Sequence, residues 1–189
     1  MDLEWDDRRA RQYVANVGLI TSNGPNGKNI MSAEWTHYLS YKPALMAVCV
    51  APYHASHKNI EETKEFGLNL AADNQASLTS VAGGNSGTSV DKIKVLEELG
   101  FEFYEAKQIN VEMVKYAAMN AECKVVQQIS LGDHTMFVGE VVEIDADPEI
   151  KPLVYHNGQF RNLGGHVEKP PQETMDKITE LVGKYKKST

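Results

Sequence analysis

The sequence has few cysteines, no long apolar run and no excess of basic residues. Its two cysteines, Cys49 and Cys123, lie far apart in apolar segments, which favours buried core residues over a disulfide. The longest apolar run, residues 44–51, is far shorter than the ~20 residues needed to cross a bilayer. The formal net charge of -7 argues against a nucleic-acid binder, because such a surface needs clustered Lys and Arg. We therefore expect neither a membrane nor a nucleic-acid partner.

The beginning of the chain also lacks the pattern of an export signal. Residues 1–4 are Met-Asp-Leu-Glu, which is acidic where a secretory signal is basic and then apolar. A cytoplasmic protein is therefore expected. The length of 189 residues suits a single domain, and no repeats or low-complexity linkers interrupt it.

The chain does contain many short strand patterns that end in turn residues. Gly132-Asp133 and Asn157-Gly158 are pairs that predict tight hairpins. Ser56 and Ser89 are the expected caps of two helices, and residues 83–87 are expected to be a loop. The predicted strands are residues 14–22, 33–40, 45–50, 66–71, 124–131, 134–144, 153–156 and 159–163. The predicted helices are residues 56–64, 74–81, 90–99 and 172–187. Because strands and helices do not alternate, we expect a mainly β fold: a closed antiparallel barrel with peripheral helices.

Residues 24–28 superficially resemble a phosphate-binding P-loop. The resemblance fails because Gly24 and Gly27 are too close together and Lys28 is followed by Asn29 instead of Ser or Thr. A plain hairpin connection is the alternative. Any nucleotide cofactor must therefore be held in another way.

A small anion site is predicted where Ser56, His57 and Lys58 begin a helix. The first turn of a helix offers unpaired N–H groups and the positive end of a dipole, and a lysine is otherwise unfavourable there. The alternative is an ordinary serine cap beside a solvated lysine. His54 and His57 have a spacing that suits a metal, but no carboxylate or cysteine accompanies them, so no metal site is predicted.

His134 directly follows a hairpin turn at the end of a predicted strand. A side chain at such a position can reach the mouth of a cleft, although an exposed turn histidine is the alternative. Serine-hydrolase chemistry is not expected, because no G-x-S-x-G elbow is present.

Six segments stand in a specific order along residues 14–163. They are VGLITS (17–22), GKNIMSAEWT (27–36), SYKP (40–43), NIEETKEFGLN (59–69), GDHTMFVGEV (132–141) and PLVY (152–155). Each is weak alone, but the ordered set resembles the flavin reductase-like, FMN-binding split-barrel family, in its flavoredoxin and ferric reductase-like branch.

The resemblance implies a six-stranded antiparallel Greek-key split barrel and a homodimer, with FMN near the dimer interface. Residues 1–189 would form one domain, with a core at about 14–163 and a C-terminal helix at about 172–187.

The resemblance also implies where the cofactor lies. The isoalloxazine ring and ribityl chain would contact residues 29–36, the phosphate would contact residues 56–58, and residues 85–87 would add a further contact. Trp35 and Tyr53 could pack on ring edges, or could be ordinary core aromatics. The implied cofactor-binding residues are Asn29, Ile30, Met31, Ser32, Ala33, Glu34, Trp35, Thr36, Tyr53, Ser56, His57, Lys58, Asn85, Ser86 and Gly87.

One position departs from the family pattern. Many relatives have a basic residue directly before the phosphate-binding hydroxyl, whereas Ala55 stands there in this chain. His54, His57 or Lys58 would then supply the positive charge.

The small residues of the 29–36 segment suit a flavin on physical grounds. Their exposed N–H groups can stabilise the negative charge of a reduced flavin without a charged side chain. The leading hypothesis is an FMN-containing oxidoreductase that takes hydride from NAD(P)H and passes electrons to free flavin, ferric iron or another acceptor. His134 would be its catalytic-site residue and would orient the nicotinamide or the flavin edge.

Three alternatives stay open. The first is an FMN-binding electron carrier without nicotinamide activity, served by a redox partner protein; the acidic charge favours it. The second is ferric reduction with Cys49 or His134 as an iron contact. The third is a barrel protein without cofactor.

Overall fold

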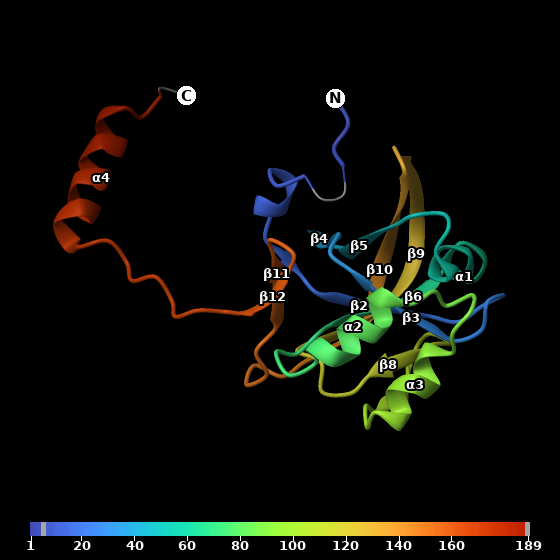
Figure 1. Ribbon diagram of the computed structural model, residues 1–189. Helices are drawn as coiled ribbons and strands as arrows, with labels where there is room; N and C mark the ends of the chain where they lie inside the picture. Colours follow the sequence, from blue (N-terminus) through green and yellow to red (C-terminus); the bar gives the residue numbers. More distant parts are fainter. Residues whose placement is uncertain (5–6, 188–189) are drawn as a thin grey trace.

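The computed structural model describes residues 1–4 and 7–187. Its centre is a seven-stranded antiparallel sheet with the strand order β3-β2-β6-β9-β10-β5-β4 (Figure 1). The strands of this sheet are β2 (Gly18–Ser22), β3 (Asn29–Ala33), β4 (Thr36–Tyr41), β5 (Ala44–Val50), β6 (Glu65–Leu70), β9 (Met119–Leu131) and β10 (His134–Ala146). The expectation of a mainly β fold with peripheral helices is confirmed.

Two smaller sheets complete the strands. One has the order β1-β11-β12, and β7 pairs with β8 in the other. Their bounds are β1 (Ala15–Asn16), β7 (Phe103–Glu105), β8 (Glu112–Val114), β11 (Leu153–His156) and β12 (Gln159–Asn162). The helices are the 3-10 turn Ala10–Gln12 and α1 (Ala55–Thr63), α2 (Ala76–Gly84), α3 (Lys92–Glu98) and α4 (Gln172–Lys184).

Both predicted hairpins are present, but other predicted elements differ from the structure. The main sheet has seven strands, one more than the family resemblance implies. The predicted strand at 14–22 divides into β1 and β2, which belong to different sheets. The predicted strand at 33–40 is β4 alone, because Glu34 and Trp35 separate it from β3. β3 was not predicted as a strand, and neither were β7 and β8, which have only three residues each.

The segment before β3 is a hairpin connection, which was the alternative to a phosphate loop. Ser22 pairs with Asn29 across β2 and β3, and Gly27 donates its N–H to the Gly24 carbonyl at 2.8 Å. Gly27 has a φ of 73°, a left-handed conformation that glycine adopts without strain.

Three helix boundaries differ from the prediction. α1 is capped by His54, so Ser56 lies inside its first turn. α2 extends through Gly83 and Gly84, which were expected in a loop. α3 is capped by Asp91, not Ser89, since the Asp91 Oδ1 accepts a hydrogen bond from the Lys94 amide at 3.2 Å.

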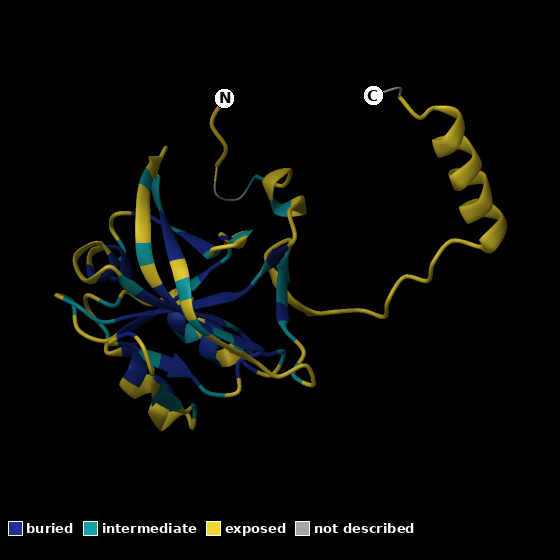
Figure 2. Cartoon of the chain, turned by 180° about the vertical axis from the view of Figure 1, so that it is seen from behind, coloured by how far each residue is buried: buried dark blue, intermediate teal, exposed yellow. Residues whose placement is uncertain are grey.

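The buried residues form two main clusters, one enclosed by strands of the main sheet and one between that sheet and the helices α2 and α3 (Figure 2). Phe66 on β6 and Phe137 on β10 are fully buried in a cluster that includes Ile60 of α1. A second buried cluster joins Ile30 of β3 to Leu78 of α2 and to residues of α3. β3 is therefore held under α2 and α3, with α1 beside it.

The C-terminal helix α4 stands apart from this body (Figures 1 and 2). All described residues from 159 onward are exposed, so α4 packs against no other described part of the chain. Its apolar residues Met175, Ile178 and Leu181 are 40%, 45% and 41% exposed. Among the described residues, no helix is both long and apolar enough to span a bilayer.

Gly139 is a position where the core has no room for a side chain. A Cβ there would lie 2.7 Å from Cys123 Cβ and 2.8 Å from the Phe66 ring. We expect Gly139→Ala to lower the free energy of unfolding by about 1–3 kcal/mol through overpacking. Urea unfolding measures this change. Gly164→Ala is the matched control, because a Cβ at Gly164 meets nothing within 4 Å. Equal midpoints for the two variants would contradict the packing described for β10.

Candidate functional site

A small hollow lies where β3, the start of α1 and the segment after α2 meet. It is lined by Asn29, Met31, Ser32, His54, Ala55, Ala82, Gly83, Asn85, Gly87 and Lys92. The hollow thus brings together residues from two segments that the sequence predicted as cofactor contacts, 29–36 and 85–87. The third predicted segment, 56–58, lies next to it. Met31 and Ser32 line its β3 side, and Ala55 belongs to the first turn of α1.

A buried hydrogen bond fixes the relation of β3 to α1. Asn29 Nδ2 donates to Ser56 Oγ at 2.8 Å, and the two residues are 4% and 0% exposed. Ser56 therefore serves neither as the helix cap nor as an open hydroxyl. Its role is to anchor Asn29 at the edge of the hollow.

Gly87 brings the third segment against the same asparagine. A Cβ at Gly87 would lie 2.1 Å from Asn29 Oδ1, so no larger residue fits without moving this side chain. The backbone at Gly87 can approach Asn29 closely only because glycine has no side chain. Asn29 thus connects β3, α1 and the 85–87 segment.

Lys92 supplies a positive charge that the sequence interpretation missed. The residue is 2% exposed, and its Nζ donates to the carbonyls of Ala82 at 2.9 Å and Asn85 at 3.2 Å. A lysine ammonium has three N–H donors. Because Lys92 also lines the hollow, a third donor is available to a ligand there. Burial lowers the pKa of Lys92 to about 8.

A pattern in the sequence could have revealed this lysine. Lys92 stands four residues before Leu96, which is fully buried on the apolar side of α3. A lysine on the apolar face of a helix is unusual and points to a specific partner.

His54 borders the hollow on the side of α1. Burial is the largest cause that lowers the pKa of His54, and the charges of Lys92, His134 and His57 lower it further. The neutral imidazole is therefore favoured near neutral pH. Lys92 is the stronger source of positive charge at this site.

Other predicted phosphate contacts face elsewhere. Lys58 is exposed and its Nζ lies 3.8 Å from Glu62 Oε1, in an i,i+4 pair on the outer side of α1. His57 Nε2 lies 2.9 Å from Thr135 Oγ1, and its ring packs on Phe137. Burial lowers the pKa of His57. Neither residue lines the hollow.

Several predicted contacts of the ring have side chains in the protein interior. Ile30 is fully buried in the core, and Ala33 is 8% exposed. Thr36 donates its hydroxyl to Asn16 Oδ1 at 2.7 Å. Only backbone groups of Ile30 could meet a ligand. Ser86 is exposed, with its hydroxyl 2.8 Å from that of Thr88.

Two other predicted site residues, Trp35 and His134, lie beyond the C-terminal end of β3. The rings of Trp35 and His134 lie 4.5 Å apart between centroids, which joins the turn after β3 to the β9–β10 hairpin. His134 Nδ1 is 2.7 Å from Asp133 Oδ1. Glu34 lies beside Trp35 in the turn, and burial raises the pKa of its carboxyl group.

Neither predicted aromatic is a core residue. Trp35 is 48% exposed and Tyr53 is 79% exposed, with the Tyr53 ring against His54. Both rings therefore present surface to solvent.

The sulfur atoms and possible metal ligands are not gathered at this site. Cys49 is half-buried on β5 and its amide donates to the Trp35 carbonyl at 3.0 Å, whereas Cys123 is buried. Burial raises the pKa of both thiols. Among the described residues, no three His, Cys, Asp or Glu side chains are grouped so that they could hold a metal ion.

Comparison with known proteins places the chain in a family. The profile of the flavin reductase like domain matches residues 10–164. This chain belongs to the flavin reductase like family. The family prediction and the prediction of a flavin reductase-type oxidoreductase are thereby confirmed.

Relatives and solved structures agree with this assignment. FMN reductase (NADH) RutF of Pseudomonas syringae is 26% identical over 150 residues, which are 79% of this chain and 80% of the relative. Ferric-chelate reductase (NAD(P)H) of Archaeoglobus fulgidus is 26% identical over 156 residues, which are 80% and 89%. Flavoredoxin from Methanosarcina acetivorans has the same fold, with a TM-score of 0.75 at 20% identity over 89% of this chain and 95% of that chain.

The ionisation of Lys92 tests the geometry of the hollow directly. We expect the Lys92 amine of the protein without ligand to titrate near pH 8, because burial disfavours the ammonium form. NMR of labelled lysine side chains measures this midpoint, with the exposed Lys94 as reference. Between pH 8 and the ordinary pKa of lysine, the unfolded chain keeps the Lys92 proton that the folded protein has lost. The free energy of unfolding therefore rises with pH across this range, because the unfavourable buried charge is removed. A Lys92 midpoint equal to that of Lys94 would show that the amine is solvated.

Proposed function

We propose that the protein binds FMN along β3, with the phosphate in the hollow, and catalyses its reduction by NAD(P)H. The observation that carries this proposal is the buried ammonium of Lys92 in a hollow that α1 also borders at its N-terminus. Family membership supports a flavin, and the relatives named for FMN and NADH support the choice of FMN and nicotinamide.

The residues present fit a phosphate. A dianion gains from the N–H groups of a helix N-terminus and from a lysine that is shielded from solvent. Lys92, the first turn at Ala55 and the backbone near Gly87 would hold it, and Ala55 leaves that backbone accessible. Lys92 thus takes the role that the sequence gave to His54, His57 or Lys58.

The ring would lie toward the other end of β3. The segment from Asn29 to Glu34, which is β3 and the residue after it, spans roughly 17 Å at the rise of an extended chain, so the phosphate end and the ring end are well separated. Backbone N–H groups near Ser32 and Glu34 would face the part of the ring where negative charge develops on reduction.

The chemistry belongs to the cofactor, and the protein supplies orientation. When bound, FMN supplies two-electron chemistry: it takes hydride from NAD(P)H and delivers electrons to free flavin, ferric iron or another acceptor. His134 and Trp35, which contact each other, would orient the nicotinamide at the exposed edge of the ring. A positioning role fits His134 better than proton transfer, since hydride transfer depends on geometry.

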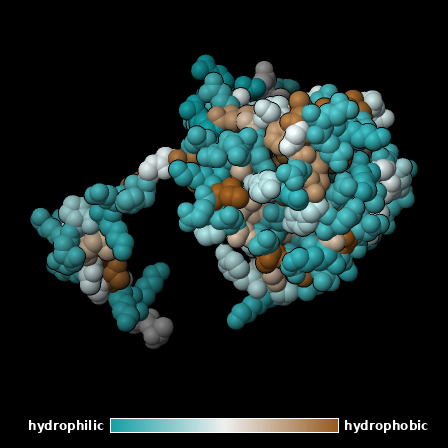
Figure 3. All heavy atoms as spheres, turned by 90° about the horizontal axis from the view of Figure 1, so that it is seen from below, coloured by the Kyte–Doolittle hydropathy of each residue, from teal (hydrophilic) through white to brown (hydrophobic). Residues whose placement is uncertain are grey.

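The proposal includes a cytoplasmic homodimer in which the main sheet forms a Greek-key split barrel. The apolar face of α4, which has no partner among the described residues, supports the dimer, because a second copy could cover it (Figure 3). Electrons could pass to a separate acceptor protein, as the name of the reductase component of a resorcinol hydroxylase from Rhizobium suggests for that relative.

Flavin bleaching tests the proposed reaction. We expect the visible absorbance of oxidised FMN, bound to the purified protein, to disappear when NADH or NADPH is added without oxygen. His134→Ala should slow bleaching with a higher KM for the nucleotide, while FMN binding stays the same. Bleaching by reduced ferredoxin but not by either nucleotide would replace the reductase by an electron carrier. If the protein binds no flavin, both the reductase and the electron-carrier hypotheses are wrong.

Two lysine variants distinguish the phosphate site proposed here, at Lys92, from the phosphate site predicted from the sequence, at Lys58. We expect Lys92→Met to weaken FMN binding about tenfold to a hundredfold, because a buried charge-assisted hydrogen bond is lost. Riboflavin, which has no phosphate, should bind this variant as it binds the wild type. Lys58→Met should change FMN affinity less than twofold, since Lys58 is exposed on the outer side of α1.

Fluorescence titration of the apoprotein gives all these affinities. Equal weakening of FMN and riboflavin by Lys92→Met would mean that Lys92 only supports the fold. A large loss of FMN affinity in Lys58→Met would instead assign the phosphate site to the outer side of α1.

A further inference from the structure

The C-terminal segment of the chain is an arm that leaves the body. All described residues from 159 onward are exposed, and Figures 1 and 2 show α4 standing away from the sheets at the end of an extended link. This link, residues 164–171, begins with Gly164-Gly165 and ends with Pro170-Pro171. Two consecutive prolines, together with the residue before them, favour a stiff and extended chain. The link therefore holds α4 away from the body of its own copy.

α4 carries an apolar stripe that needs a partner. Its large apolar residues recur at helical spacing and are Met175, Ile178, Leu181, Val182 and, at the end of the helix, Tyr185. A helix of 13 residues is only marginally stable alone in water. Asp176 and Glu180 on the opposite face carry negative charge, which does not suit an anionic membrane surface. The partner that this helix requires is therefore a protein surface.

The outer edge of β4 is an open apolar surface on the body. Among the described strands, β4 pairs with β5 alone, at one end of the main sheet. Trp35, directly before the strand, is 48% exposed, and Leu39 and Tyr41 are 48% and 81% exposed. The pairing with β5 shifts between Tyr38 and Ser40, which bends this edge. A bent edge resists the addition of another strand, whereas a helix can cover it.

The helix and the strand match in length and in area. α4 is about 20 Å long at a rise of 1.5 Å per residue, and β4 is about 20 Å long at a rise of ~3.3 Å. The large apolar side chains of both elements are about half exposed, so one helix on one strand edge would bury on the order of 900 Å² at ~200 Å² per side chain. Two such contacts around a twofold axis reach the ~1,600 Å² of a stable interface.

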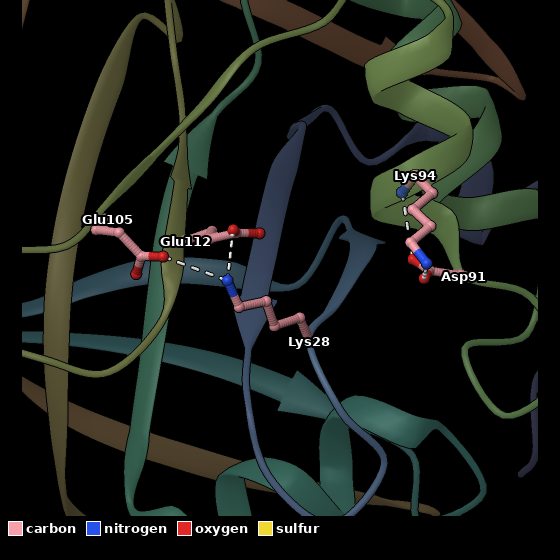
Figure 4. Close-up of polar contacts among 5 residues, drawn as sticks. All are labelled: Lys28, Asp91, Lys94, Glu105 and Glu112. Atoms are coloured by element: carbon pink, nitrogen blue, oxygen red, sulfur yellow. Dashed lines mark hydrogen bonds and ion pairs between the residues drawn. The ribbon is translucent and has the colours of Figure 1, made fainter.

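The charged groove beside α3 and β8 is a poorer place for this helix. Lys28 pairs there with Glu112 at 2.6 Å, and Lys94 pairs with Asp91 at 3.6 Å (Figure 4). An apolar helix face would take these charged groups out of water without offering them hydrogen bonds. The apolar edge of β4 is therefore the surface that fits α4.

We propose that two copies of the chain exchange their C-terminal arms, so that α4 of one copy lies along β4 of the other. One end of the bound helix then reaches Trp35, whose ring centroid is 4.5 Å from that of His134. The second copy thereby completes the wall of the proposed nicotinamide site. The inference rests on the homodimer of the proposed function, because a single copy has no second arm.

Crosslinking between copies tests the position of α4. The full-length variant Leu39→Cys with Ile178→Cys, in a Cys49→Ala background, has one new cysteine in the middle of β4 and one in the middle of α4, while Cys123 is buried. We expect a short bis-maleimide to join two copies into a covalent dimer, in either orientation of the helix. Leu39→Cys with Glu180→Cys is the matched control and should give little covalent dimer, because Glu180 lies on the opposite face of α4.

Three crosslinking results would overturn the proposal. They are the absence of a crosslink, a crosslink within one copy, and equal crosslinking of the test and control variants. A crosslink within one copy leaves a monomer on a denaturing gel and would mean that α4 folds back onto its own β4.

Two full-length serine variants test whether the arm covers the site. Ile178→Ser with Leu181→Ser removes the centre of the apolar stripe. Asp176→Ser with Glu180→Ser is the matched control, since it makes the same kind of change on the opposite face of the same helix.

Quenching of Trp35 fluorescence by acrylamide compares these variants without any flavin. Trp5, the other tryptophan of the sequence, is replaced by phenylalanine. We expect quenching to be about twofold stronger in the apolar-face variant than in the wild type, because a packed interface excludes solvent, and unchanged in the control. KM for NADH or NADPH should rise about threefold or more in the apolar-face variant alone, while FMN affinity stays within about twofold. Equal quenching in all three proteins would contradict the inference.

Failure of this inference and failure of the proposed function give different results. If the protein is a dimer that reduces FMN, but α4 neither crosslinks to the other copy nor shields Trp35, the arm exchange is wrong and the proposed reaction stands. If sedimentation shows a monomer, the homodimer fails together with this inference, and flavin bleaching still decides the reaction.

Discussion

The hydrogen bond from Asn29 to Ser56 is the contact on which the site depends. Asn29 is the first residue of β3, and Ser56 lies in the first turn of α1, so one buried bond sets the strand beside the helix N-terminus. Gly87 lies directly against the same asparagine. Burial of both partners makes the bond costly to break, because each would be left with an unsatisfied polar group. Three segments distant in the sequence are thus fixed around one small space.

The position of Lys92 is explained by the same arrangement. A buried ammonium is unfavourable unless acceptors compensate it, and the carbonyls of Ala82 and Asn85 do so only in part, since burial still lowers the pKa of Lys92. A bound anion would stabilise the charged form. In the proposed site, the protein would thus hold the positive charge in place before the anion binds, which is how binding sites are often preorganised.

Much of the fold was predictable from the sequence because the signals are local. Asn157-Gly158 and Gly132-Asp133 predict two hairpins through turn geometry, and the apolar run between two prolines predicts the strand β5. The convergence of Asn29, Gly87 and Lys92 was not predictable in this way, since it depends on long-range packing of α2 and α3 on β3. Ser56 was predicted as a helix cap and a phosphate contact, but its buried hydrogen bond with Asn29 could not be read from its neighbours in the sequence. Lys58 was predicted in the site from its place in the first turn of a helix and from the family resemblance, but α1 turns its side chain toward solvent, where it pairs with Glu62.

The most direct test of this account is a crystal structure of the protein with FMN. We predict the phosphate in the hollow between β3, α1 and Gly87, within hydrogen-bonding distance of Lys92 Nζ, and the ring toward Trp35 and His134. A phosphate on the outer side of α1 beside Lys58, or a ring placed away from β3, would contradict it.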